Sequence, residues 1–124
     1  MVATGAGWYR YDEKKQPQPD PAVDALIRAH AAKRGIAPRD IGAQEIVERC
    51  VFAMVNEGAK LIEQGVVHRP HEIDAVWLFG MGFPQQRGGP MFYADQIGLD
   101  RVHAALERYA RQVGDEFFAP SPLL

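Results

Sequence analysis

The stretch from Gly42 to Gln64 constrains the fold of this chain more than any other part of it. It contains no proline, its apolar residues recur at helical spacing, and Gly65 follows where a glycine often ends a helix. The apolar side is made of Val47, Cys50, Val51, Met54, Gly58, Leu61 and Ile62, with Ile46 and Val55 widening it. A helix that is apolar over so much of its circumference is predicted to be the central helix of a bundle.

Prolines and glycines mark the ends of the other predicted helices. Asp20 is a good capping residue, the proline after it begins a helix without losing a hydrogen bond, and Gly35 ends that helix. The same reasoning predicts helices over residues 70–79, 90–97 and about 99–114. No stretch alternates between apolar and polar residues for long enough to predict a sheet. The predicted fold class is all-α, a compact helical bundle.

The chain divides at its first proline-rich segment. Residues 1–19 carry the aromatic cluster Trp8, Tyr9 and Tyr11 and then a polar run, which predicts an extended N-terminal arm followed by an exposed turn. Residues 20–124 are predicted to form the helical domain. The tail from Phe117 to Leu124 is apolar enough that we expect it to dock on that domain.

Charge and composition exclude several classes of partner. The formal net charge is -2, from 14 basic and 16 acidic residues, so neither nucleic acid nor an anionic membrane is expected to bind. No apolar run approaches the ~20 residues of a membrane span, and no secretory signal pattern is present. Cys50 is the single cysteine and can form no internal disulfide. Together these features indicate a cytoplasmic protein.

The glycine-rich loop between Gly80 and Pro90 is the first candidate binding site. Glycines can bring backbone N–H groups close to a phosphate, and the helix that begins at Pro90 would favour an anion at its start. Neither nucleotide fingerprint is met, however, and a turn that places aromatic side chains into a core needs glycine for steric reasons alone. The steric explanation is preferred, and Arg87, Gly88 and Gly89 remain the candidate substrate-binding residues.

No catalytic or metal-binding set emerges from the residues themselves. His68 and His71 lie three apart with a proline between them, and neither a cysteine nor a carboxylate pair completes a metal site. Cys50 falls on the apolar side of the long helix and is expected to behave as a small buried hydrophobe. We therefore expect no catalytic residue and no metal in this chain.

Asn56 and Glu57 form a polar pair inside an otherwise apolar helix. One interpretation is a solvent-facing edge. The other is a buried polar cluster that ties neighbouring loops together. The spacing alone does not separate the two.

A series of motifs resembles a known family over essentially the whole chain. They are Gly5 to Asp12, Glu45 to Cys50, Met54 to Ala59, Ile73-Asp74, Gly80 to Pro84, Arg87 to Asp95, Ile97 to Leu99 and Ala119 to Leu124. This order closely resembles the C-terminal helical domain of 3-hydroxyacyl-CoA dehydrogenases, specifically its second copy in the multifunctional fatty-acid-oxidation enzymes.

The resemblance implies a larger parent enzyme. Such an enzyme oxidises an L-3-hydroxyacyl-CoA to the 3-ketoacyl-CoA with NAD⁺, and it combines a hydratase or isomerase part, a Rossmann domain that binds NAD, and two helical copies. The family's catalytic histidine and glutamate lie in the Rossmann part, so this chain is expected to hold no cofactor. The first copy supplies an asparagine whose matching position here is Glu48. That replacement implies a copy that kept the fold and lost the chemistry.

The leading hypothesis is therefore a structural domain that takes the place of a partner subunit and is inactive alone. Its expected partners are the Rossmann domain, the first helical copy and the hydratase or isomerase part, and self-association is expected through the arm at Trp8 and the tail at Phe117. The alternative is a stand-alone acyl-CoA-binding or adaptor module that uses Arg87 for the CoA phosphates. A helical interaction module unrelated to fatty acids is a third possibility.

Overall fold

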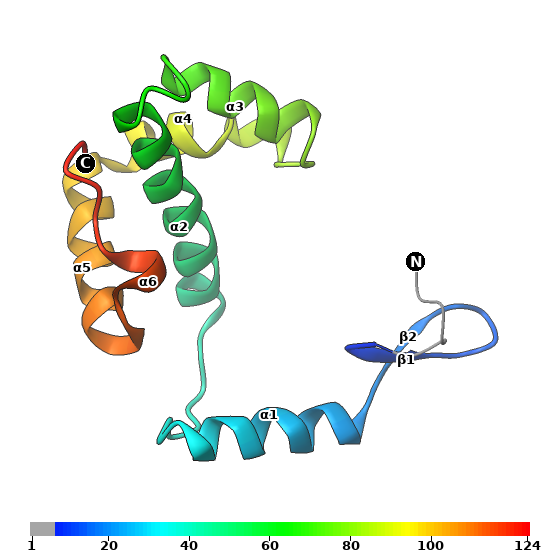
Figure 1. The fold of residues 1–124 in the computed structure, drawn as a ribbon. Coiled ribbons are helices and arrows are strands. Elements are labelled where there is room, and N and C mark those ends of the chain that lie inside the picture. Colours follow the sequence, from blue (N-terminus) through cyan, green and yellow to red (C-terminus); the bar gives the residue numbers. More distant parts are fainter. Residues whose placement is uncertain (1–6) are drawn as a thin grey trace. The chain divides into compact units, whose positions relative to one another are not determined.

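The computed structural model describes residues 7–124, except for the side chains of Asp115 and Glu116. Gly5 and Ala6, which belong to the first motif, lie outside the described residues. The chain forms two compact units, Met1–Asp40 and Ile41–Leu124. The division between them differs from the predicted one after residue 19, because the first helix groups with the N-terminal segment (Figure 1).

The N-terminal arm is a β-hairpin. Strands β1 (Tyr9–Tyr11) and β2 (Pro17–Pro19) pair antiparallel, with Arg10 opposite Gln18. The turn is held by Asp12, whose carboxylate accepts hydrogen bonds from the backbone N–H groups of Lys14 at 2.9 Å and Gln16 at 2.8 Å. The expectation that no segment would form a sheet was wrong here, since strands of three residues are too short to show alternation.

Helix α1 (Pro21–Lys33) begins and ends as predicted. The Asp20 carboxylate accepts the Ala22 N–H at 3.0 Å and also pairs with Arg10 of β1 at 3.2 Å. Gly35 ends the helix with a left-handed φ of 66°. No residue of α1 is buried, and the hairpin aromatic Trp8 is 73% exposed.

The second unit is a helical bundle around α2 (Ala43–Glu63), which contacts four other helices (Figure 1). These four are α3 (Pro70–Phe79), α4 (Pro90–Ile97), α5 (Leu99–Val113) and the short α6 (Asp115–Phe118). A single 3₁₀ turn, η1 (Gln85–Arg87), interrupts the glycine-rich loop. The predicted all-α class is confirmed, and the helix ends fall within a residue or two of the expected positions.

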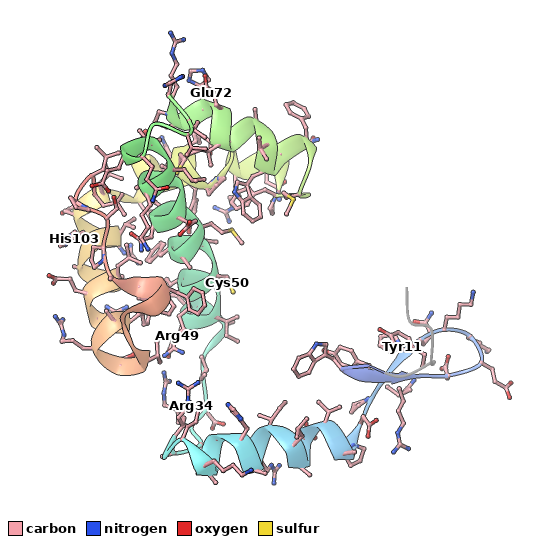
Figure 2. The ribbon with its side chains drawn as sticks, viewed as in Figure 1. Tyr11, Arg34, Arg49, Cys50, Glu72 and His103 are labelled. Atoms are coloured by element: carbon pink, nitrogen blue, oxygen red, sulfur yellow. The ribbon has the colours of Figure 1, made fainter. Side chains whose placement is uncertain are left out.

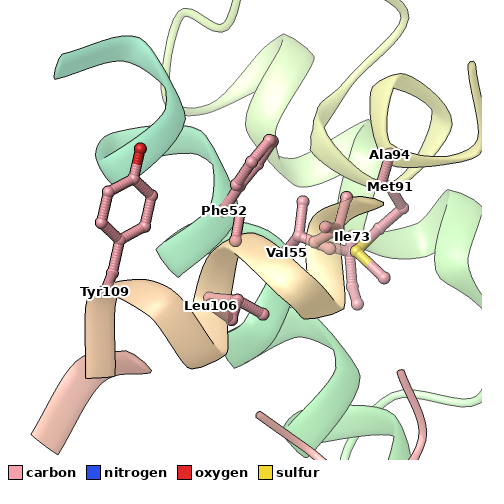
Figure 3. Packing of buried hydrophobic residues seen from close by; sticks show 9 residues of the cluster. Phe52, Val55, Ile73, Met91, Ala94, Leu106 and Tyr109 are labelled. Carbon is pink, nitrogen blue, oxygen red and sulfur yellow. The ribbon is translucent and has the colours of Figure 1, made fainter. Parts of the chain in front are cut away.

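The buried side of α2 agrees with the predicted one only in part, since Val55 and Gly58 are buried as expected but Phe52 was not placed on that side. The core cluster takes Phe52 and Val55 from this helix and packs them against Ile73, Met91, Ala94, Val102, Ala105, Leu106 and Tyr109 (Figure 3). Val47 is 51% exposed, and Cys50 is also exposed rather than buried. Figure 2 shows the Cys50 side chain on the side of α2 that faces away from α5.

The difference between the predicted and the observed buried side of α2 has a physical cause. Phe52, Val55, Asn56 and Ala59 follow the same i, i+3, i+4, i+7 spacing as the predicted side, so periodicity does not choose between them. Small residues let other elements approach closely, and at Gly58 a Cβ atom would lie 2.8 Å from the Met91 sulfur of α4. Partner elements, rather than the helix itself, selected the side that packs.

Candidate functional site

Glu48 lies at the centre of a polar cluster that joins α2 to α5. One carboxylate oxygen, Oε2, accepts hydrogen bonds from the Tyr109 hydroxyl at 2.7 Å and from Arg108 at 3.2 Å. The other oxygen, Oε1, accepts one from Gln44 at 3.1 Å and pairs with Arg101 at 3.5 Å. The Glu48 side chain is only 15% exposed. Its charge is therefore largely enclosed between α2 and α5, and both carboxylate oxygens have polar partners there.

The electrostatics of the cluster favour the ionised carboxylate. Burial by itself raises the pKa of Glu48, but the hydrogen bonds from Tyr109 and Gln44 and the charges of Arg108 and Arg101 outweigh it and lower that pKa below its ordinary value. Burial and the hydrogen bond to Glu48 raise the pKa of Tyr109. The cluster therefore holds a carboxylate and a neutral phenol, which together stabilise the fold without leaving a free proton acceptor.

The Tyr109 ring extends this cluster into the core. The guanidinium of Arg108 lies 4.7 Å from the ring centroid and that of Arg49 lies 5.2 Å from it, while the Phe118 ring packs at 5.7 Å. Arg49 also pairs with Glu45 at 2.9 Å. Sequence reasoning singled out Glu48 but missed Tyr109 and Arg108, because they lie about sixty positions away and no local pattern links them.

Asn56 and Glu57 have different environments. The Asn56 side chain is fully buried, and its amide donates to the carbonyl oxygens of Ala119 at 2.8 Å and Phe117 at 3.2 Å. Its carbonyl oxygen accepts the Ser121 N–H at 2.8 Å. Glu57 is exposed and pairs with Lys60 at 3.9 Å. Asn56 thus anchors the C-terminal tail, which docks as expected, whereas Glu57 faces solvent.

The glycine-rich loop surrounds a buried carboxylate. Asp74 of α3 accepts the backbone N–H groups of Met91 at 2.7 Å and Phe92 at 3.1 Å, and so caps α4 from another helix. A Cβ atom on Gly89 would collide with the Asp74 side chain, and one on Gly88 would collide with the Phe92 ring. Both glycines also have positive φ. The two candidate glycines therefore have a packing role, and the N-terminal N–H groups of α4 already hold an anion.

Asp74 is a residue that sequence reasoning missed, although one signal pointed to it. The helix that begins at Pro90 is preceded by Gly88 and Gly89, which carry no side-chain acceptor. A helix start without a local acceptor has to find one elsewhere in the fold. Asp74 supplies it.

Arg87 is the candidate residue that remains available to a ligand. Its guanidinium lies over the Tyr93 ring, 5.8 Å from the centroid, and no carboxylate of the described residues forms an ion pair with it. His68 and His71 are both exposed, and residues 7–124 contain no group of three potential ligands that could hold a metal ion. No helix in this described range is long and apolar enough to cross a membrane.

The decisive comparison is with a family model. Residues 46–124, the greater part of the chain, match the model described as 3-hydroxyacyl-CoA dehydrogenase, C-terminal domain. The chain belongs to this family. The motif series in the sequence resembled the same family.

Several relatives match this chain over most of its length. A peroxisomal bifunctional enzyme of Danio rerio is 46% identical over 124 residues, which cover 98% of this chain and 17% of that protein. The enzyme of the same name from Homo sapiens is 40% identical over 114 residues, covering 90% and 16%. A peroxisomal fatty acid beta-oxidation multifunctional protein of Oryza sativa subsp. japonica is 36% identical over 126 residues, covering 98% and 17%. The chain thus spans about a sixth of the length of these relatives.

The comparisons correct one expectation. The cytoplasmic location inferred from the sequence is contradicted, because the relatives are named as peroxisomal enzymes. That inference rested on a lone cysteine and on the composition of the first residues, and neither feature is specific to the cytoplasm. They do not distinguish the cytoplasm from another reducing compartment.

NAD does not fit the described residues. Dinucleotides bind across the strand ends of a parallel sheet, with a glycine-rich turn before the following helix. Residues 7–124 contain one two-stranded antiparallel sheet, and the glycine-rich loop follows a helix and encloses the Asp74 carboxylate. We therefore derive no hydride-transfer step from this chain.

Proposed function

We propose that this chain is the second helical copy of a multifunctional 3-hydroxyacyl-CoA dehydrogenase and that its role is structural. The observation that carries the proposal is the environment of Glu48, at the position where the family's first copy has its asparagine. The carboxylate is enclosed by Tyr109, Arg108, Arg101 and Gln44 and has no oxygen left for a substrate. In this role the domain supports its neighbours and does not contact the reacting atoms.

The parent enzyme in this proposal oxidises an L-3-hydroxyacyl-CoA to the 3-ketoacyl-CoA with NAD⁺ in fatty-acid β-oxidation. A Rossmann domain, a first helical copy and a hydratase or isomerase part are the proposed partners of this domain. A peroxisomal location follows the names of the relatives. The length of those relatives supports a multidomain parent, since the match covers about a sixth of each.

The test is an activity assay on the purified chain. With L-3-hydroxybutyryl-CoA and NAD⁺, we expect no NADH above the rate without protein. The variant Glu48→Asn, which places the first copy's residue at this position, is expected to stay inactive as well. Turnover by the unmodified chain that disappears in Glu48→Gln would contradict the structural role.

A domain that covers a partner surface should expose apolar groups when it is isolated. Phe79 is 85% exposed, Trp8 73% and Phe117 62%. Light scattering over a concentration series is expected to show self-association that weakens in Trp8→Ser or Phe117→Ser. A monomer at every concentration would favour the stand-alone alternative.

The alternative, an acyl-CoA-binding or adaptor module, depends on Arg87. The Asp74 carboxylate already accepts the N–H groups at the start of α4, so a CoA phosphate would depend mainly on this one guanidinium. A titration with a CoA thioester that changes the fluorescence of Trp77, and loses the effect in Arg87→Glu, would support this alternative over the structural role.

A further inference from the structure

A trough runs along the exposed side of α2 that the sequence had placed in the core. Its larger part, about 500 Å³, lies between α2, the loop residues Phe83 and Pro84, and Tyr93 of α4. A second hollow of about 330 Å³ continues it toward Ile97. Val47 and Tyr93 line both hollows, so the two form one elongated surface, called here the α2 trough.

The two hollows of the α2 trough differ in the charged residues that line them. Arg87 is the one charged residue that lines the larger hollow, and it has no carboxylate partner among the described residues. In the second hollow, Arg101 and Glu48 pair with each other at 3.5 Å. The larger hollow is therefore mostly apolar with a single cation, whereas the second hollow carries one paired charge of each sign.

The size of the α2 trough suits a small molecule better than a protein. Nine residues line the larger hollow, whereas a stable protein interface takes roughly 20–30 residues a side. Its volume of about 500 Å³ lies inside the range of small-molecule sites, roughly 300–1,000 Å³. An apolar lining with a single polar anchor is the usual composition of such sites.

We propose that the α2 trough binds a fatty carboxylate, with the alkyl chain along Val47 and Tyr93 and the carboxylate at Arg87. A linear chain matches the elongated shape, and one guanidinium matches one carboxylate. A CoA thioester carries several phosphates, for which the larger hollow offers no second cation. The second hollow borders the Glu48 cluster, but the anchor Arg87 and the reporter Cys50 both lie in the larger hollow, so dodecanoate binding there is tested independently of the proposed function.

Cys50 provides a direct readout. It is the single cysteine of the chain, it is exposed, and it lines the larger hollow. We expect dodecanoate, kept below its micelle concentration, to slow the reaction of Cys50 with a thiol reagent in a saturable manner. Far-UV circular dichroism recorded in parallel verifies that the fold is intact at each concentration.

Variants separate the two parts of the proposed site. Arg87→Gln is expected to weaken dodecanoate binding by about fivefold, since the guanidinium is exposed and its contribution is screened by solvent. Val47→Asp puts a carboxylate into the wall that both hollows share and is expected to abolish protection. Arg111→Gln is the matched control, because Arg111 is exposed on α5 and does not line the trough. Val47 is half exposed, so its variant should fold.

Further measurements distinguish a fatty carboxylate from other occupants of the α2 trough. Dodecanol has the same chain without the charge and is expected to protect Cys50 about fivefold more weakly. Dodecanoyl-CoA is expected to protect less well than dodecanoate. Without ligand, the labelling rate is expected to be the same at low and high protein concentration.

Five results would overturn the proposal, and the first four come from the unmodified chain. These are no protection by dodecanoate, equal protection by dodecanol, stronger protection by dodecanoyl-CoA than by dodecanoate, or a labelling rate that falls with protein concentration. The fourth of these results would assign the trough to contacts between copies of the chain. Equal loss of protection in Arg87→Gln and Arg111→Gln would likewise exclude Arg87 as the anchor.

Discussion

The Tyr109 hydroxyl donates a hydrogen bond of 2.7 Å to the Glu48 carboxylate, joining α5 to α2 across sixty-one positions of sequence. Tyr109 is 2% exposed, and its ring packs against Phe118 at the opposite end of the side chain. One side chain therefore connects the polar cluster, the apolar core and the segment that leads into the tail. The Glu48 carboxylate thus has a defined structural role in the contact between α2 and α5.

Removing the hydroxyl should measure how much the pair stabilises the fold. Tyr109→Phe keeps the ring and is expected to lower the free energy of unfolding by about 1.5–3 kcal/mol, the range for a hydrogen bond to a charged group. Urea unfolding measures it. The double variant with Glu48→Gln should lose less than the sum of the two single variants, whereas additive losses would mean that the two residues are not coupled. Glu107→Gln, exposed on α5, is the control and should change little.

The Glu48 cluster should make stability depend on pH on the acid side. The pKa of Glu48 in the folded chain is lowered from the ordinary 4.5, so the unfolded chain binds the proton more readily than the folded one. The stabilisation is complete above pH 4.5 and is lost as pH falls through the lower folded pKa. Because Glu48→Gln cannot ionise, the difference in unfolding free energy between it and the unmodified chain should shrink in that window. A difference that stays constant from neutral pH downward would show that Glu48 titrates normally.

The tail should depend on the amide of Asn56. Asn56→Asp retains the size but replaces the two N–H donors to Phe117 and Ala119 with a buried charge facing carbonyl oxygens. We expect a loss of about 3–5 kcal/mol and early hydrogen exchange in the tail. The neighbouring Glu57→Gln is the matched control on the same helix and should stay within about 0.5 kcal/mol. Equal effects at the two positions would refute the anchoring role.

Gly89 should tolerate no side chain. Gly89→Ala introduces strain at a φ of 102° and a collision with Asp74, the residue that caps α4. The expected loss is about 3 kcal/mol or more, since both backbone strain and a buried carboxylate are affected. Gly65 also has positive φ, at 70°, but has open space around it, so Gly65→Ala should cost only about 1–2 kcal/mol. Thermal unfolding of the two variants separates the two effects, because Gly89→Ala adds a collision to the backbone strain whereas Gly65→Ala adds strain alone.

Helix boundaries were predictable because they depend on neighbouring residues. Asp20 caps α1 with its own side chain, and Gly35 ends it through a conformation that glycine adopts without strain. Pro70 and Pro90 begin α3 and α4 as expected. The exception is the hairpin, whose strands of three residues are held by the Asp12 turn and carry no detectable period.

The sequence by itself determined the class, the helix ends and the family of this protein, since capping, periodicity and ordered motifs are local properties of the chain. Tertiary structure alone decided which side of α2 packs, why Asn56 is buried while Glu57 is not, and that Asp74 caps a distant helix. These outcomes depend on which surfaces meet. When a helix is apolar over most of its circumference, several packed arrangements satisfy the same pattern, and only the positions of its partners select one of them.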